Sequence, residues 1–386
     1  MKKIDNILLL AGGDSTRFWP LNEKILTSFL GRPYIEHILD KITGFADNLF
    51  IVVSKENKKA IEQIAVSNTH IIIQPSPTGM GGAVLSCKNK IKGKTLILGN
   101  DLFDYSILHI LFEKEADMIL LAQRVKSYYP GGYLRLKGDK IEAIEEKPDP
   151  KKTPSDLVRL VADYLKEINV LISAIESTHS FDDKAYEQAL TSIIQNKNAT
   201  YHRYDDYWYP LKYPWHVLPM MKYFLSTVKG SRIGKNVKIS QSAKIVEPVY
   251  IGDNTIIGDY ALVRESHIGN NCLIGGYCEV VRSYIGDEVM LHRNYIGDSV
   301  IDKKVLIGSG TTTANFRFDE GYIKDTNLKK LGAIIGKNCR IGVNSSLLPG
   351  VKIGKNTWIG PGEVIKNDIK DNIYVFNNET RVNKLT

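Results

Sequence analysis

The stretches that decide the fold read IGDNTIIGDYALV at residues 251–263 and IIGKNCRIGVNSSLLPGVKIGKNTWIGPGEVI at residues 334–365. In both, an aliphatic residue returns at every sixth position. The two strict runs comprise Ile233, Ile239, Ile245, Ile251, Ile257 and Val263, then Ile335, Ile341, Leu347, Ile353, Ile359 and Ile365. A period of six fits neither a helix of 3.6 residues per turn nor simple strand alternation. It fits a parallel β-solenoid whose coils each contain three short strands.

The residues between these aliphatic positions support the same fold. Small or β-branched residues follow four places later, at Val237, Ala243, Val249, Thr255, Ala261, Cys339, Ser345, Val351 and Thr357. Asn, Asp and Gly stand where each corner requires a positive φ or a side chain that bonds its own backbone. The competing interpretation, a glycine-rich loop with an accidental period, is set aside.

The repeat is interrupted in its middle. Its steps shorten to five residues at Ile268, Ile285 and Ile296, and its regularity is lost between Ile307 and Ile335. An insertion in a solenoid projects from one edge as a loop, and such loops are where function concentrates.

Length and composition predict a two-domain enzyme in the cytoplasm. A chain of 386 residues exceeds what one core usually serves, and we expect domains at residues 1–228 and 229–386. The four cysteines form no CxxC pair, so neither a disulfide framework nor a zinc site is expected. The apolar run at residues 7–11 is too short for a membrane span or signal peptide. The net charge of +8 is thinly spread, which favours anionic small molecules over nucleic acid.

The first part of the chain alternates strand-like and helix-like segments. Expected strands are residues 7–11, 49–53, 70–74, 95–99 and 118–122, and expected helices are residues 34–42, 55–65, 81–90, 106–115 and 214–228. A hairpin is expected to turn at Gly138-Asp139. This alternation predicts a parallel sheet wrapped by helices, with a ligand site at the carboxyl ends of the strands.

The first turn of this part carries candidate phosphate-binding groups. The stretch LAGGDSTRFWPLNEK, residues 10–24, places Gly12 and Gly13 directly after a strand, where backbone N–H groups can approach a phosphate. Arg17 and Lys24 add positive charge seven residues apart.

Together with SFLGRPYIEHIL at residues 28–39, this stretch resembles the signature of sugar-1-phosphate nucleotidylyltransferases. The spacing resembles the branch of bifunctional N-acetylglucosamine-1-phosphate uridylyltransferase/glucosamine-1-phosphate acetyltransferases, whose archaeal members are similar through the solenoid as well. The resemblance implies an α/β Rossmann-like nucleotidyltransferase domain followed by a left-handed parallel β-helix of hexapeptide repeats. It also implies a homotrimer.

The resemblance implies a role for a set of residues in the first domain. Nucleotide or sugar binding falls to Leu10, Ala11, Gly12, Gly13, Gln74, Gly79, Gly132, Glu146 and Asn169. Arg17 and Lys24 are expected to hold the triphosphate, and Asp101 is expected to hold Mg²⁺.

In the solenoid, the stretch LHRNYIGDSV carries the residue that resembles the family's general base, His292. Glu279 matches the carboxylate that orients this histidine. The acceptor-sugar positions match Arg264, Tyr295, Asn315 and Lys330. A histidine with a pKa near neutrality suits removal of an amine proton during attack on a thioester.

The sequence departs from the family pattern at five places. Ser15 stands where the signature has a third glycine, and Glu23 where it has a proline. Val281 and Phe316 replace a lysine and a tyrosine of the acetyltransferase pattern. Pro210 replaces a second metal-binding aspartate two residues after Trp208.

We therefore predict a bifunctional transferase that uses acetyl-CoA, an amino-sugar 1-phosphate and UTP or dTTP, with Mg²⁺ as cofactor. One alternative is an acetyltransferase whose nucleotidyltransferase domain is degenerate. A second is a plain hexose-1-phosphate nucleotidylyltransferase whose solenoid only assembles the oligomer. A third is a regulatory or structural subunit of the same build, as in translation-initiation exchange factors, which predicts that catalytic residues are lost from both domains.

Overall fold

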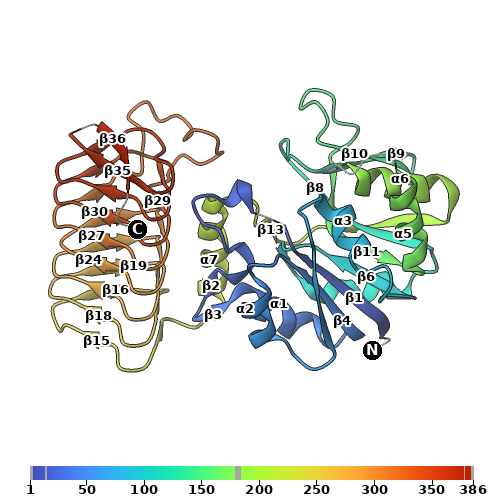
Figure 1. Cartoon of the computed structure of the whole chain (residues 1–386), viewed down its shortest axis with the longest axis horizontal. Coiled ribbons are helices and arrows are strands. Elements are labelled where there is room, and N and C mark those ends of the chain that lie inside the picture. The colour runs from blue at the N-terminus through green and yellow to red at the C-terminus, as the bar shows by residue number, and fades with distance from the viewer. Residues whose placement is uncertain (1–2, 14, 179–183, 378, 384–386) are drawn as a thin grey trace. The chain divides into compact units, whose positions relative to one another are not determined.

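The computed structural model describes residues 3–13, 15–178, 184–377 and 379–383 (Figure 1). The chain divides into two compact units. The first contains Met1–Asp14 and Ile35–Pro210, and the second contains Ser15–Tyr34 and Leu211–Thr386. A short N-terminal segment thus belongs with the C-terminal part. The expected boundary at residue 228 stays a prediction.

The first unit is built on a mixed sheet. Its strands are β1 (Ile4–Ala11), β4 (Ala46–Val53), β5 (Thr69–Ile73), β6 (Thr95–Leu98), β8 (Met118–Arg124), β9 (Gly132–Lys137), β10 (Lys140–Glu146), β11 (Leu157–Leu165) and β12 (Ala199–Tyr204). Along the main path they lie in the order β10-β9-β11-β6-β1-β4-β5, and β8 joins β11 to β12. Strands β1, β4, β5 and β6 are parallel, as expected, but β11 runs antiparallel to β6 and β8. The strands expected to be parallel, including β8, therefore all run in one direction, and the sheet is mixed because β11 and β10 run the opposite way.

Helices cover this sheet. They are α1 (Tyr34–Ile42), α2 (Lys58–Ile64), α3 (Gly79–Leu85), α4 (Leu108–Glu113), α5 (Ile168–Ser177) and α6 (Ala185–Asn196), with the 3₁₀ turn η3 (Tyr105–Ile107). A two-stranded ribbon joins β7 (Leu102–Phe103) to β13 (Trp208–Tyr209). Helix α1 occupies the expected residues, and the hairpin of β9 and β10 turns at Gly138-Asp139 as expected. The buried core includes Leu8, Val52, Ile97, Leu120 and Leu171, so burial of apolar side chains holds helices and sheet together.

The second unit contains the predicted solenoid. The strands of its first sheet are β14 (Arg232–Ile233), β17 (Tyr250–Ile251), β20 (His267–Ile268), β23 (Tyr284–Ile285), β26 (Val300–Ile301), β29 (Ile334–Ile335) and β32 (Lys352–Ile353). The second sheet contains β15 (Lys238–Ile239), β18 (Ile256–Ile257), β21 (Leu273–Ile274), β24 (Met290–Leu291), β27 (Leu306–Ile307), β30 (Arg340–Ile341), β33 (Trp358–Ile359), β35 (Ile373–Phe376) and β36 (Glu379–Val382). The third contains β16 (Lys244–Val246), β19 (Leu262–Arg264), β22 (Glu279–Val281), β25 (Tyr295–Gly297), β28 (Thr312–Thr313), β31 (Ser346–Leu347) and β34 (Val364–Ile365).

Stacked coils pair in parallel and in register throughout, except that β36 returns antiparallel along β35. Most of the six-residue aliphatic positions are buried in one continuous core, among them Ile257, Ile341 and Leu347. Ile233 and Ile239 of the first coil are exceptions and are exposed. The expected fold class, an α/β domain followed by a left-handed parallel β-helix, is confirmed.

The five-residue steps are accommodated by buried polar side chains. Where a step is shortened after the third sheet, Ser266, Ser283 and Ser299 lie fully buried in successive coils. Each hydroxyl donates to a backbone carbonyl two residues earlier, at 2.7–2.9 Å. The missing residue is thereby compensated, because a buried backbone group without a partner is costly.

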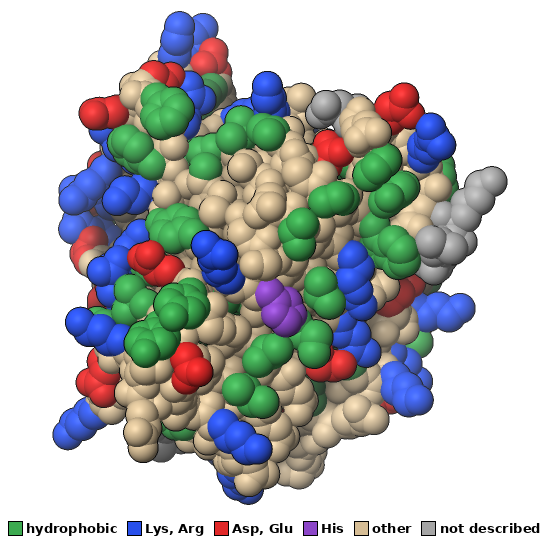
Figure 2. Space-filling model, turned by 90° about the vertical axis from the view of Figure 1, so that its left-hand side faces the viewer, with side chains coloured by type: hydrophobic (Ala, Val, Ile, Leu, Met, Phe, Trp, Pro, Cys, Tyr) green, Lys and Arg blue, Asp and Glu red, His purple; other side chains and the backbone are tan. Residues whose placement is uncertain are grey.

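The remaining elements of the second unit pack on one side of the solenoid. They are α7 (Val217–Ser226) with the 3₁₀ turn η4 (Pro214–His216), and, from the early segment, η1 (Thr16–Phe18), η2 (Lys24–Leu26), β2 (Ser28–Phe29) and β3 (Arg32–Pro33). The insertion after β28 leaves the stack as a loop (Figure 1). In the view of Figure 2, basic side chains lie among acidic and hydrophobic ones and are not gathered into a single patch.

Candidate active sites

His292 lies in the corner between β24 and β25, within the five-residue step that ends at Ile296. Its side chain is exposed. The backbone N–H of His292 donates to Oδ1 of Asn294 at 2.6 Å. The corner therefore exposes the imidazole to solvent, while the Asn294 side chain accepts a hydrogen bond from the backbone of His292.

Asn294 was not identified from the sequence, although it organises this corner. Its side chain is buried and its Nδ2 donates to the carbonyls of Gly308 at 2.8 Å and Thr311 at 3.0 Å, both in the next coil. One side chain thus satisfies three backbone groups around a shortened step. The polar residue next to the irregular Ile296 step was the available signal.

Three predicted acetyltransferase residues come together on the third sheet. Glu279 of β22 pairs directly with Tyr295 of β25. Asn315, just beyond β28, approaches the Tyr295 hydroxyl with its Nδ2 at 3.4 Å. A Cβ at Gly297 would lie 2.7 Å from that hydroxyl and 2.8 Å from the same Nδ2, so only glycine leaves them room.

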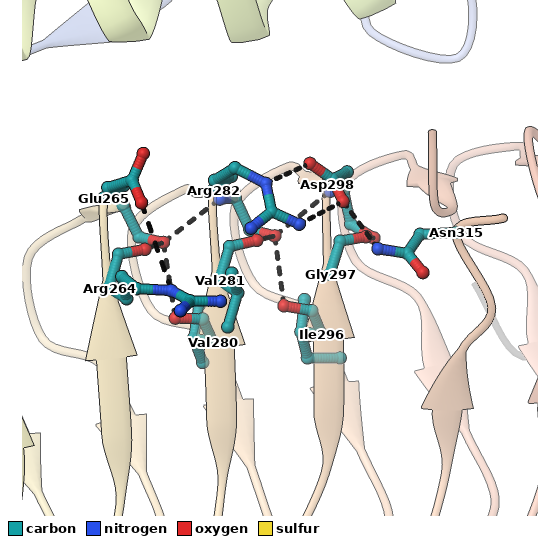
Figure 3. A network of polar contacts seen from close by, with 12 residues as sticks. Arg264, Glu265, Val280, Val281, Arg282, Ile296, Gly297, Asp298 and Asn315 are labelled. Atoms are coloured by element: carbon teal, nitrogen blue, oxygen red, sulfur yellow. Dashed lines mark hydrogen bonds and ion pairs between the residues drawn. The ribbon is translucent and has the colours of Figure 1, made fainter. Parts of the chain in front are cut away.

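A polar network runs beside these residues, along the shortened corners of three coils (Figure 3). Arg282 donates with Nε and a terminal nitrogen to the two carboxylate oxygens of Asp298, each at 2.7 Å. Asn315 Nδ2 donates to Oδ2 of the same carboxylate at 2.5 Å. Because a guanidinium–carboxylate fork fixes both planes, Asp298 orients the amide of Asn315.

Arg264 lies at the end of this network (Figure 3). It precedes Val281 and Gly297 in the same row of stacked strand ends. Its Nε is buried and approaches Glu265 at 4.0 Å, while two fifths of its side chain remains exposed. The guanidinium can therefore reach a solvent-borne anion.

The inserted loop is closed at its base. Phe316 and Lys330 form an antiparallel bridge, and the N–H of Leu331 donates to the carbonyl of Asn315 at 3.0 Å. The structure thus brings Lys330, whose side chain is exposed, to the base of the loop that carries Asn315. Ile323 is buried and anchors the loop.

In the first unit, the glycine turn contacts Gln74, one of the residues predicted to bind the nucleotide or sugar. Leu10 and Ala11 end β1 and are buried. A Cβ at Gly12 would lie 2.6 Å from Oε1 of Gln74, so these residues touch. Gln74 Nε2 donates to the carbonyl of Gly79 at 3.1 Å.

Asp101 follows β6 at the edge of the sheet where β1 also ends. Its Oδ2 accepts a hydrogen bond of 2.9 Å from Nε1 of Trp208. Pro210 directly follows the Trp208 strand and offers only a carbonyl. Two aspartates lie shortly before Trp208 and could replace the lost carboxylate. Asp205 pairs with Arg203 at 2.7 Å, and Asp206 accepts from the N–H of Tyr207 at 2.7 Å.

Gly132 and Glu146 face one another across the β9–β10 hairpin. Both the Glu146 carboxylate and the Arg159 Nε lie within 4 Å of a Cβ placed on Gly132, at 3.3 and 3.8 Å. The Gly132–Glu146 pair therefore lies next to an ionised group that the sequence analysis missed.

That group is a buried network behind the hairpin. Arg159 donates to Asp163 at 2.5 Å and to Glu187 at 2.9 Å, and the Tyr186 hydroxyl donates to Asp163 at 2.8 Å. All three ionisable side chains are almost fully buried. Burial raises the pKa of Glu187 to about 7, against the opposing effect of Arg159, since one guanidinium balances only one of two carboxylates. Charged residues inside the apolar run LVRLVADYL were the available signal.

One predicted residue of the first unit lies away from these groups, and two others lie in the second unit. Asn169 opens α5 beyond the end of β11, which is antiparallel to β6, so it lies at the edge opposite Asp101. The short motif EINVLI begins helix α5 here, and a sugar-binding role for Asn169 stays a prediction. Arg17 and Lys24 lie in the segment that belongs to the second unit. Asp14 of the same motif lies outside the described residues.

Comparison with known proteins identifies the family. The nucleotidyl transferase profile matches residues 6–210, and the profile of the bacterial transferase hexapeptide, with six repeats, matches residues 230–265 and 332–367. The bifunctional protein GlmU of Methanococcus maripaludis strain C7 is 32% identical, over 97% of this chain and 98% of that protein. The chain belongs to the family of GlmU-type bifunctional proteins.

Two further relatives extend the comparison. The bifunctional sugar-1-phosphate nucleotidylyltransferase/acetyltransferase of Sulfurisphaera tokodaii is 31% identical over 94% of this chain and 97% of that protein. GlmU of Methanocaldococcus jannaschii is 27% identical, over 96% and 97%. The resemblance predicted from the sequence motifs is confirmed. Between the two hexapeptide matches lie the shortened steps and the insertion, which carry His292 and Asn315.

The described residues contain no helix long and apolar enough to cross a membrane.

Proposed function

We propose that this protein is a bifunctional transferase of the GlmU type, which acetylates an amino-sugar 1-phosphate and joins a sugar 1-phosphate to UTP or dTTP. The observation that carries the proposal is the grouping of Glu279, Tyr295 and Asn315 on adjoining coils beside the exposed His292 corner. Full-length similarity to bifunctional relatives supports both activities.

In acetyl transfer, His292 removes a proton from the sugar amine as its nitrogen attacks the thioester carbonyl of acetyl-CoA. The carbon–sulfur bond then breaks, and the proton passes to the departing CoA thiolate. Glu279 orients the imidazole, and Tyr295 and Asn315 hold the sugar. Arg264 and Lys330 bind the anionic phosphate.

In nucleotidyl transfer, a phosphate oxygen of the sugar 1-phosphate attacks the α-phosphorus of the nucleotide. The bond from that phosphorus to the β-phosphate oxygen breaks, and pyrophosphate leaves. Such a reaction depends on positioning and charge neutralisation rather than on covalent help. Leu10, Ala11, Gly12, Gly13, Gln74 and Gly79 take the nucleotide, and Gly132 with Glu146 takes the sugar. The roles of Arg17 and Lys24 with the triphosphate stay predictions.

Asp101 is the residue that would hold Mg²⁺, whose chemistry is to neutralise charge on the phosphates. Mg²⁺ is commonly held by one or two carboxylates together with substrate phosphates and water, so a single aspartate fits such a site. One Asp101 oxygen already accepts from Trp208. No group of three His, Cys, Asp or Glu side chains suited to a metal occurs among the described residues.

The hydrogen bond between Trp208 and Asp101 also supports a second candidate, an acetyltransferase whose nucleotidyltransferase site is degenerate. Pro210 removes one carboxylate, and the Trp208 bond occupies part of the other. Both changes weaken Mg²⁺ binding without touching the solenoid site. The proposal of a homotrimer rests on the family alone, and light scattering that reports a monomer at micromolar concentration would contradict it.

One assay tests the function. Purified protein is mixed with acetyl-CoA and a panel of amino-sugar 1-phosphates, and thiol release is followed. The acetylated product is then offered UTP and dTTP, and pyrophosphate is measured. Both signals support the bifunctional proposal, and thiol release alone supports the second candidate. Release of pyrophosphate without thiol supports a solenoid that only assembles the oligomer. If neither thiol nor pyrophosphate is released, the result supports a regulatory subunit.

A further inference from the structure

Asp298 stands at a solenoid corner where the backbone takes a left-handed conformation. Its φ is +46°, and Arg282, at the same corner of the preceding coil, has a φ of +48°. Glycine adopts this conformation at lower cost, which indicates that the charged side chains themselves are needed here. The N–H of Asp298 donates to the carbonyl of Val281 at 2.9 Å, and its carbonyl accepts from the N–H of Gly332 at 2.8 Å. The carboxylate is therefore carried by a backbone that both neighbouring coils hold.

The Asp298 carboxylate decides which way the amide of Asn315 faces (Figure 3). Its Oδ2 accepts from Arg282 and from Nδ2 of Asn315, whereas its Oδ1 accepts from Arg282. Only 11% of the Asp298 side chain is exposed, so water competes little for these bonds. An ionised carboxylate can only accept hydrogen bonds, so the nitrogen of the amide must face it. The opposite orientation would set two acceptor oxygens against each other.

The oxygen of the same amide is left for a ligand. Figure 3 shows it pointing away from Asp298. Within the part of the chain that the structure describes, no group donates to this oxygen. The Tyr295 hydroxyl lies beside it and accepts from Nδ2 at 3.4 Å. Asn315 therefore offers a hydrogen-bond acceptor next to Tyr295.

We propose that Asp298 is a positioning residue for acetyl transfer, which acts by turning the carbonyl oxygen of Asn315 toward the acceptor sugar. That oxygen accepts a hydrogen bond from an amine or hydroxyl group of the sugar, and Arg282 holds the carboxylate in place. The inference rests on the proposed acetyl transfer and adds a requirement for the acceptor, which must place a hydrogen-bond donor opposite Asn315. A site built for such a group rejects analogues that lack it.

Asp298→Asn should weaken binding of the acceptor and leave the chemical step nearly unchanged. The substituted amide cannot accept from Arg282 and Asn315 together, and its NH₂ group can turn the Asn315 amide round, so that an N–H group faces the sugar. Loss of one hydrogen bond of this kind should raise the KM for glucosamine 1-phosphate by about tenfold. The kcat and the KM for acetyl-CoA should stay within about twofold.

Two double variants show whether Asp298 acts through Asn315. Asp298→Asn/Asn315→Asp reverses the pair: the new amide donates to the new carboxylate, whose second oxygen faces the sugar. It should bind glucosamine 1-phosphate better than either single variant, because Asn315→Asp alone sets two carboxylates against each other. Asp298→Asn/Asn315→Ala should bind no more weakly than Asn315→Ala alone, since residues that act through one contact are not additive.

The matched control is Asp319→Asn, which breaks another arginine–aspartate pair of the second unit. Nε of Arg317 donates to Oδ1 of Asp319 at 2.8 Å, and both side chains are exposed in the inserted loop. The control removes the same charge from the same region, and acceptor binding should stay unchanged. The unfolding temperature of every variant is measured, so that a general loss of structure is recognised.

Binding of glucosamine 1-phosphate is measured by calorimetry, beside thiol release from acetyl-CoA. The probe 2-deoxyglucose 1-phosphate, which has no donor at C2, identifies the group that Asn315 binds. If Asp298→Asn weakens binding of glucosamine 1-phosphate alone, the donor is the amine; if it weakens binding of both sugars equally, the donor is a hydroxyl. Both results support the inference.

Equal affinity of wild type and Asp298→Asn for glucosamine 1-phosphate overturns the inference, and so does a reversed pair that binds no better than the single variants. If wild type binds glucosamine 1-phosphate but releases no thiol, the proposed acetyl transfer fails, and the affinities of the variants still decide the inference. If wild type does not bind this sugar phosphate at all, both fail.

Discussion

Asn294 holds His292 through the backbone: the N–H of His292 donates to the Asn294 side-chain oxygen at 2.6 Å, and the amide of Asn294 donates to the next coil. These hydrogen bonds fix the backbone of the corner that carries the exposed imidazole. A general base works only when its nitrogen lies within hydrogen-bond reach of the proton it removes.

We therefore predict that Asn294→Ala lowers acetyl transfer by about tenfold or more and reduces thermal stability, because buried carbonyls of Gly308 and Thr311 lose their donor. Thiol release and the unfolding temperature are the measurements. The control is Asn236→Ala, which removes an exposed asparagine pair with Asn254 at the start of the solenoid. Full acetyl transfer in Asn294→Ala would show that the corner needs no such support.

His292→Ala should reduce acetyl transfer by about two to four powers of ten, the range typical of a general base. Nucleotidyl transfer should not change, since His292 is not among the residues proposed to bind the nucleotide or its metal. The two rates are measured on one preparation. Equal loss of both activities, or loss of neither, would reject the assignment.

Nucleotidyl transfer should need unusually high Mg²⁺ or run slowly, because Asp101 acts without a second carboxylate at Pro210. Trp208→Phe removes the N–H that bonds Asp101 Oδ2 and should lower the half-saturating Mg²⁺ concentration. A magnesium titration of pyrophosphate release measures this.

The alternative for this site is that Asp206 serves as the second ligand. Saturation near millimolar Mg²⁺ with ordinary turnover, lost in Asp206→Ala, would establish it. Asp101→Asn should abolish turnover in either case. UTP binding with no turnover at any Mg²⁺ concentration would leave the first domain as a nucleotide sensor or a structural partner.

Acid should destabilise the solenoid through His267. This histidine is buried between Tyr250 and Tyr284, at 4.6 and 4.8 Å between ring centroids, and burial lowers its pKa to about 4. The unfolded chain binds a proton at His267 near pH 6.5, whereas the folded chain does so only near pH 4. The stabilisation that comes from keeping His267 neutral is therefore complete above pH 6.5 and is lost as the pH falls toward 4. The loss amounts to roughly 3 kcal/mol.

His267→Phe retains an aromatic ring in the stack and should flatten the dependence of the unfolding temperature between pH 6.5 and 4. His109→Gln, at an exposed histidine of the first unit, is the control. An unaltered acid dependence in His267→Phe would assign the loss to other groups.

The sequence by itself determined the solenoid and most of its site. Each coil of a solenoid packs only against the coils next to it, so residues at a constant spacing in the chain occupy equivalent positions in successive coils. That is why Ile335, Ile341 and Leu347 could be placed inward. The break in spacing indicated the interrupted region of the solenoid, and the family resemblance then pointed to His292 and Asn315. Helix α1 and the β9–β10 hairpin could also be predicted from the sequence, because local periodicity specifies the helix and a Gly-Asp turn specifies the hairpin.

Only the tertiary structure decided the contacts between residues far apart in the chain. Arg159 meets Glu187 because β11 and α6 pack together, and EINVLI starts a helix away from the site because β11 runs antiparallel. Trp19 bonds Asp371 across 352 residues, which no period in the sequence encodes. Such pairs depend on how whole elements pack, since the free energy of burial is shared among many side chains and leaves no local signature.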